Sequence, residues 1–94
     1  MEWAHQYAEA LTKAAGVEIA LTPEEEEAVL LLARLVAHGS ERRHAPLSTF
    51  LAGKFAGERA QRGVSGSQAL AEAAAIAEDL LAARGGGGPG QPAT

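Results

Sequence analysis

The sequence predicts an all-α fold, a compact four-helix bundle, from its composition and from the spacing of its apolar residues. Apolar residues form 47% of the 94-residue chain and aromatic residues only 4%, and alanine and leucine dominate the apolar set. These two residues favour helices, whereas strands are enriched in β-branched and aromatic residues. Four stretches with apolar residues at helical spacing are separated by glycine or proline. We therefore expect one helical domain over residues 1–84 and a disordered Gly/Pro-rich tail over residues 85–94.

The first helix is expected over about residues 2–15. Its apolar side is formed by residues at i, i+4 and i+8, namely Trp3, Tyr7 and Leu11. Gly16 suits the position that ends this helix. Residues 17–21 then alternate apolar and polar side chains, but five residues without a partner strand do not form a sheet. We expect a short extended strap between helices one and two, attached to the bundle by Val17, Ile19 and Leu21.

The second helix is expected from Pro23 to about His38, and its start is strongly marked. Thr22 can cap the helix, Pro23 fits its first position, and Glu25 completes a capping box. The four consecutive glutamates at 24–27 allow a metal-binding interpretation, but acidic residues in a first turn also complement the helix dipole, and we favour that role. Apolar residues cover a wide arc of this helix, which indicates a central position in the bundle.

The third helix is expected over about residues 46–62. Small residues line one stripe of it: Gly53, Gly57 and Ala60. A glycine inside a helix costs about 1 kcal/mol relative to alanine, so we expect close packing along this stripe within the bundle as the compensation. The fourth helix, capped by Ser65 or Ser67, carries one apolar face and ends near Arg84.

The composition argues against several classes of protein. The net charge of −4 argues against nucleic-acid binding, and the absence of cysteine excludes disulfides, cysteine-ligated zinc and thiol catalysis. The N-terminus lacks the features of a signal peptide and no apolar run approaches the length of a membrane span, so we expect a cytoplasmic protein that binds no membrane. No catalytic triad, phosphate loop or metalloprotease motif occurs. The sequence therefore assigns no catalytic residue, metal site or cofactor, and it does not favour an enzyme.

The hinge before the third helix, residues 40–46, is the one concentrated polar segment and the candidate binding site. The start of a helix has unpaired N–H groups and the positive end of its dipole, which together favour an anion. Basic and hydroxyl side chains suited to a phosphate or carboxylate group lie around this start: His38, Arg42, Arg43, His44, Ser48 and Thr49. The alternative is structural: Arg42 pairs with an acidic residue such as Glu41, and the two hydroxyls only cap the third helix. The histidines of this segment match no tight zinc spacing.

The hinge and the third helix also resemble the signature of a known family. The matching residues are Ala37-His38, Glu41-Arg42, Ala45-Pro46-Leu47, Thr49-Phe50-Leu51, Gly53 and Ala56-Gly57. They look like the motif of a small actinobacterial domain of unknown function. That domain stands alone, or is fused to or neighbours the molybdopterin-guanine dinucleotide biosynthesis protein, the guanylyltransferase of molybdenum cofactor maturation. Lys54 and the Arg43-His44 pair depart from the motif, which leaves Arg42 as the better candidate for an anion-binding residue.

Three hypotheses about function follow from these observations. The resemblance implies a non-catalytic accessory or protein-interaction domain in molybdenum cofactor biosynthesis, with the guanylyltransferase as its partner. The hinge residues support a second hypothesis, a small-ligand binder that holds a phosphate-bearing cofactor or nucleotide. The small-residue stripe supports a third, a structural domain that forms a homodimer. The sequence leaves all three open.

Overall fold

The computed structural model describes residues 2–85. Four helices follow one another along the chain: α1 (Trp3–Ala15), α2 (Pro23–Gly39), α3 (His44–Ala60) and α4 (Gly66–Gly85). No strand occurs within residues 2–85, so the predicted all-α class, its four helices and the non-helical strap after the first are confirmed. The predicted disordered tail lies outside the described residues, except for Gly85, which is the last residue of α4.

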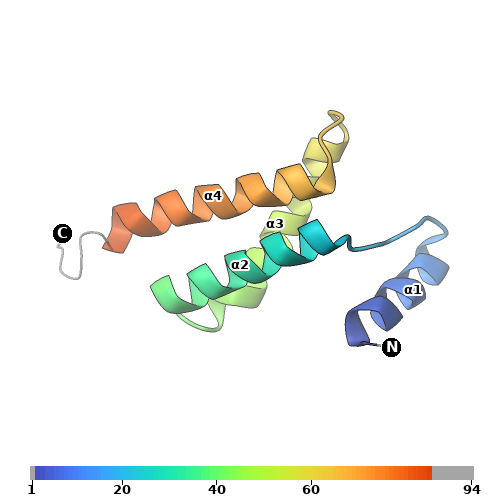
Figure 1. Cartoon of the computed structure of the whole chain (residues 1–94), viewed down its shortest axis with the longest axis horizontal. Coiled ribbons are helices and arrows are strands. Elements are labelled where there is room, and N and C mark those ends of the chain that lie inside the picture. The colour runs from blue at the N-terminus through green and yellow to red at the C-terminus, as the bar shows by residue number, and fades with distance from the viewer. Residues whose placement is uncertain (1, 86–94) are drawn as a thin grey trace.

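Three of the four helices build the hydrophobic core. Figure 1 shows α2 and α4 side by side and running in the same direction, with α3 crossing behind them in the return direction. Each of these helices contacts the other two. The core is formed by Leu32 and Val36 of α2, Ala52 of α3, and Leu70 and Ala74 of α4. Because two of these side chains are methyl groups, the helices approach closely but bury little apolar area.

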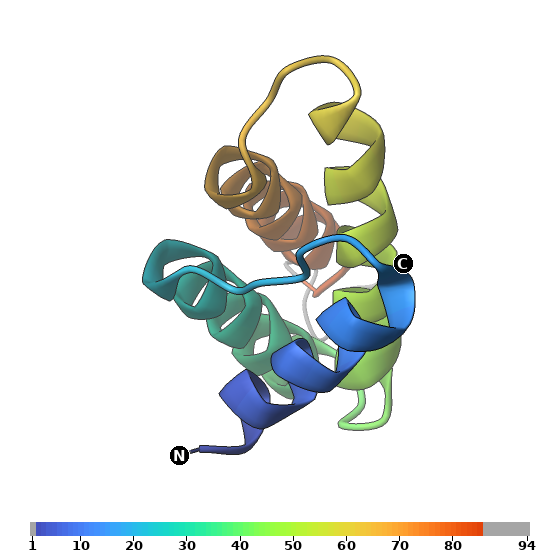
Figure 2. The ribbon, with the colours of Figure 1, turned by 90° about the vertical axis from the view of Figure 1, so that its right-hand side faces the viewer.

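Helix α1 lies apart from the other three and contacts none of them within the described residues (Figures 1 and 2). The predicted apolar side of α1 is present, but it is exposed: Trp3 keeps 71% of its surface accessible and Tyr7 keeps 52%. The two rings stack on each other, with centroids 5.4 Å apart and planes 12° apart. The amphipathic pattern therefore predicted the helix correctly but not what would cover it.

The strap is attached to α1 and not to the bundle. The hydroxyl of Thr12 accepts the N–H of Ile19 at 2.8 Å and donates to the carbonyl of Ile19 at 3.0 Å. Gly16, with a φ of 77°, ends α1 in the left-handed conformation and turns the chain back toward this pair. The expected attachment of the strap to the bundle is wrong, because Val17 is 63% exposed and the apolar side chains at 19 and 21 are exposed as well.

The predicted helix starts are confirmed for α2 and α4. The Thr22 hydroxyl accepts the N–H of Glu25 at 3.1 Å, and the Glu25 carboxylate accepts the N–H of Thr22 at 2.9 Å, which completes the capping box. At α4, Ser65 is the capping residue, since its hydroxyl accepts the N–H of Gln68 at 3.2 Å.

The predicted close packing at the small-residue stripe of α3 is wrong. A Cβ added at Gly53 or Gly57 would meet no atom within 4 Å, and Ala60 is exposed as well. The side of α3 that meets the core carries Ala52 and Ala56 instead, so the two glycines lie on the outer side. A close approach does occur at Gly39, the last residue of α2, where a Cβ would lie 3.1 Å from the Leu81 side chain of α4.

Candidate functional site

The hinge residues are largely engaged with one another. The Ser40 hydroxyl lies 2.7 Å from Nδ1 of His44, in a hydrogen bond between the end of α2 and the first residue of α3. The guanidinium of Arg43 donates from Nε to Glu41 at 3.1 Å. The side chain of Arg42 is exposed and makes no hydrogen bond or ion pair to any residue from 2 to 85. Of the basic residues in the hinge, Arg42 is therefore the one available to an external anion.

The start of α3 offers fewer N–H groups than its sequence predicted. Helix α3 begins at His44, two residues before the expected start. The N–H of His44 donates to the carbonyl of Glu41 at 2.9 Å, and that of Ala45 donates to the carbonyl of Arg42 at 3.1 Å. Pro46 has no N–H. The groups that would otherwise hold an anion at a helix start are thus used by the preceding turn or absent.

The other predicted site residues have separate surroundings. Thr49, in the second turn of α3, donates its hydroxyl to the carbonyl of Pro46 at 3.0 Å. Ser48 lines an apolar groove between α3 and α4. His38 lines a different hollow of about 380 Å³, between the C-terminal halves of α2 and α4. Arg42, Arg43 and His44 are consecutive in the chain. The structure does not gather all the predicted residues around one cavity.

Metal-binding side chains do not gather in the described part of the chain. Among residues 2–85 there is no group of three or more histidine, aspartate or glutamate side chains placed to hold a metal ion. Of the consecutive glutamates at the start of α2, Glu25 is engaged in the capping box.

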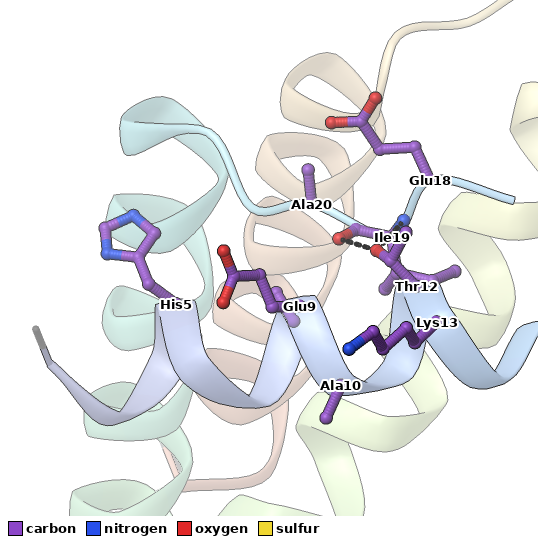
Figure 3. Close-up of a pocket in the computed structure, with 9 residues that line it drawn as sticks. His5, Glu9, Ala10, Thr12, Lys13, Glu18, Ile19 and Ala20 are labelled. Carbon is purple, nitrogen blue, oxygen red and sulfur yellow. Dashed lines mark hydrogen bonds between the residues drawn. The ribbon is translucent and has the colours of Figure 1, made fainter.

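A hollow of about 730 Å³ lies between α1 and the strap (Figure 3). Figure 3 shows His5 and Glu9 projecting from α1 on the side where the strap passes, with Thr12 joined to Ile19 at its far end. Nδ1 of His5 is paired with the carboxylate of Glu2 at 3.1 Å, and both side chains are more than half exposed. Ala8, Ala10, Ile19 and Ala20 form the apolar part of the lining of this hollow.

The most distinctive surface is apolar and lies on α3 and α4. A groove of about 260 Å³ runs between these helices, with Leu32 and Ala52 on its lining. Its other apolar walls are Leu51, Phe55, Ala73, Ile76, Ala77 and Leu80. We call these residues, with Ser48, the α3/α4 groove. It occupies the position between two helices where a further helix would complete a bundle.

A second apolar area adjoins the groove on the outer side of α3. Leu47 and Phe50 are exposed there beside Gly53 and Gly57, and we call these four residues the outer face of α3. Phe50 is 68% exposed, and Lys54 lies over its ring at 5.3 Å from the centroid. The sequence predicted that this part of the third helix packs inside the bundle. The one signal against that prediction was the charge of Lys54 among apolar neighbours.

An ion pair between α3 and α4 was also not predicted from the sequence. Arg59 donates to the carboxylate of Glu72 at 2.7 Å, and its guanidinium lies 5.1 Å from the centre of the Phe55 ring. The two charged side chains are 13 residues apart, and nothing in the helical spacing pairs them. The pair closes the end of the α3–α4 contact near the turn that joins these helices.

The chain matches a known family along nearly its whole length. No helix within residues 2–85 has both the length and the apolar character to cross a lipid bilayer. No curated protein and no solved structure matches the chain. The sequence model of one family, described as Domain of unknown function (DUF6457), matches residues 1–89. The chain therefore belongs to the DUF6457 family.

Proposed function

We propose that this chain is a non-catalytic accessory domain that acts by binding another protein in the cytoplasm. The observation that carries the proposal is the amount of apolar surface left uncovered. Thirteen large apolar side chains within residues 2–85 are exposed, and several of them adjoin one another on α3 and α4. Single exposed apolar residues are ordinary, but contiguous apolar areas on a small domain mark sites of protein contact.

The outer face of α3 is the proposed docking surface for the partner. Phe50 supplies a large rigid ring beside the charged Lys54, and Gly53 and Gly57 leave the helix backbone open to close approach. Aromatic anchors flanked by polar groups are the usual centres of protein interfaces. The family resemblance includes Leu47 and Phe50, and an exposed position fits recognition better than internal packing.

The partner proposed for this surface is the guanylyltransferase of molybdenum cofactor maturation. The support is the resemblance of the hinge and of α3 to a domain that is fused to or neighbours that enzyme. In this role the chain would hold or position the guanylyltransferase and would carry out no chemistry itself.

A binding measurement with purified proteins tests this proposal. The full-length chain, its Phe50→Asp variant and its Leu30→Asp variant are each titrated with the guanylyltransferase by calorimetry. Leu30 is a matched control, because it is exposed on α2, away from α3. We expect the wild type and Leu30→Asp to bind and Phe50→Asp to bind at least about tenfold more weakly. Absence of binding by the wild type would overturn the choice of partner, and equal binding by all three would overturn the choice of surface.

A second candidate function is the binding of a phosphate-bearing cofactor or nucleotide at the hinge. The observation in its favour is the exposed guanidinium of Arg42, which has no partner within residues 2–85. Titration with GTP, followed by thermal denaturation, tests it, with Arg42→Ala as the test variant and Arg62→Ala as the control. A stabilisation by GTP that persists in Arg42→Ala would exclude the hinge as the site, and no stabilisation would exclude GTP as the ligand.

A third candidate is a structural domain that pairs with a second copy through its small-residue stripe. The favourable observation is that the space above Gly53 and Gly57 is open. Light scattering at high protein concentration tests it, since a monomer would exclude any homodimer.

A further inference from the structure

Two apolar surfaces of this chain lack a partner and differ in shape. The apolar side of α1 is a convex stripe, formed at i, i+4 and i+8 by Trp3, Tyr7 and Leu11. The α3/α4 groove is a hollow between two helices. An amphipathic helix that lays such a stripe into an apolar groove is a recurrent mode of recognition.

The strap holds α1 away from the groove of its own chain. It is fixed at one end by the two hydrogen bonds between Thr12 and Ile19, and at the other by the capping box of Thr22 and Glu25. Only residues 20 and 21 lie between these two fixed points. Two residues span at most about 7 Å, so little of the strap is free to reposition α1. Figures 1 and 2 show the result, with α1 standing off one end of the other three helices.

We infer that a second copy of this chain supplies the missing contact, and that two copies exchange their α1 helices. Each α1 lies in the α3/α4 groove of the other copy, so that every groove receives a fourth helix and the pair has two-fold symmetry. A short, rigid connection that keeps a helix off its own domain favours such an exchange between identical chains. The inference rests on the proposal that the chain works through protein contacts, but it uses a different surface from the outer face of α3.

The exposed apolar area is sufficient for a dimer of this kind. Trp3 and Tyr7 are 71% and 52% exposed, and Leu80 of the groove is 60% exposed. With about 150–250 Å² for a whole large apolar side chain, the stripe of α1 and the exposed walls of the groove each offer roughly 300 Å². The two exchanged contacts together then bury roughly 1,200 Å², which is the lower limit for a stable, specific interface.

Sedimentation of the full-length chain tests the exchange. The test variants are Trp3→Glu on α1 and Leu80→Glu in the groove, and both residues are exposed, so each variant keeps its helical circular dichroism. The control is Leu30→Glu, an exposed leucine of α2 outside the groove. We expect dimers from the wild type and the control, and a dissociation constant raised at least about tenfold in each test variant.

Mixing the two test variants distinguishes exchange from any other dimer. In an equimolar mixture, the intact α1 of Leu80→Glu meets the intact groove of Trp3→Glu, so one whole contact is restored. We expect the mixture to dimerise more strongly than either variant alone. A wild type that stays monomeric at all concentrations, or a mixture no stronger than its components, overturns the inference.

The result is separable from that of the partner experiment. The Phe50→Asp variant is expected to dimerise like the wild type, and Trp3→Glu is expected to bind the guanylyltransferase like the wild type. Dimerisation lost in Phe50→Asp would place the second copy on the outer face of α3 and would also overturn the exchange.

Discussion

Glu25 lies at the starts of two helices. Its Oε1 accepts the N–H of Thr22 and completes the cap of α2, while its Oε2 lies against Gly66, the first residue of α4. A Cβ at position 66 would overlap this carboxylate, so a glycine is required there for the approach and not for its backbone conformation. The capping residue of α2 thus also lies close to the start of α4.

Replacement of Gly66 by alanine should release this contact. Gly66→Ala displaces the Glu25 carboxylate and should lower the free energy of unfolding by about 0.5–1 kcal/mol, as measured by urea denaturation. In a Glu25→Ala background the same replacement should be neutral or stabilising, because alanine is the better helix former. Additive effects of the two substitutions would show that the residues are not coupled.

The hydroxyl of Thr22 should account for a measurable share of stability. Thr22→Ala removes the acceptor for the N–H of Glu25 and should lower the free energy of unfolding by about 1 kcal/mol. Thr22→Ser retains the acceptor and should restore most of the loss in the same urea titration. Equal losses in both variants would attribute the effect to the methyl group and not to the cap.

At the scale of the element, α3 presents its glycines to solvent and its alanines to the core. A methyl group at Gly53 or Gly57 would disturb no contact within the described chain. The two glycines therefore lower the stability of the helix, and no close packing compensates for that loss. We expect Gly53→Ala and Gly57→Ala each to raise the free energy of unfolding by about 0.5–1 kcal/mol in urea denaturation.

Gly39 is the matched control for these substitutions. It also lies in a helix, but a Cβ there would press on the Leu81 side chain at 3.1 Å, so Gly39→Ala should give no such gain. A loss of stability in Gly53→Ala would mean that the outer face of α3 is packed in solution.

The sequence predicted the helices better than it predicted which of their sides meet. The capping box at Thr22 and the glycine that ends α1 are local signals, and the structure confirms both. The orientation of α3 was not predictable by the same means, because Ala52 and Ala56 on one side and Gly53 and Gly57 on the other are equally small. The order of side chains along a helix does not decide which of two small-residue stripes meets the core.

At the scale of the whole molecule, the packed core consists of α2, α3 and α4. The amphipathic pattern of α1 implied that its apolar side would be covered, but a pattern in one chain does not distinguish its own core from that of a neighbour. The candidate site has the same limit. The charged residues of the hinge were identifiable from the sequence, whereas the α3/α4 groove exists only once the two helices are packed.

Removal of α1 should therefore leave the rest of the molecule folded. A chain that begins at Leu21 retains the cap of α2 and every contact of the core. At low protein concentration its free energy of unfolding should lie within about 1 kcal/mol of that of the full chain, by urea denaturation followed by circular dichroism. In the full chain, Leu70→Ala should cost about 2–5 kcal/mol, because Leu70 belongs to the core. A truncation as costly as Leu70→Ala would show that α1 packs on its own bundle.

Because α1 is separate from the core, fluorescence and circular dichroism report on different parts of the chain. Its one tryptophan and its one tyrosine are Trp3 and Tyr7, and both belong to the helix that lies outside the core. Intrinsic fluorescence therefore records changes at α1, whereas far-ultraviolet circular dichroism is dominated by α2, α3 and α4. The two probes will give transitions that do not coincide, and here that difference signifies the separate unfolding of α1 and not a folding intermediate of the core.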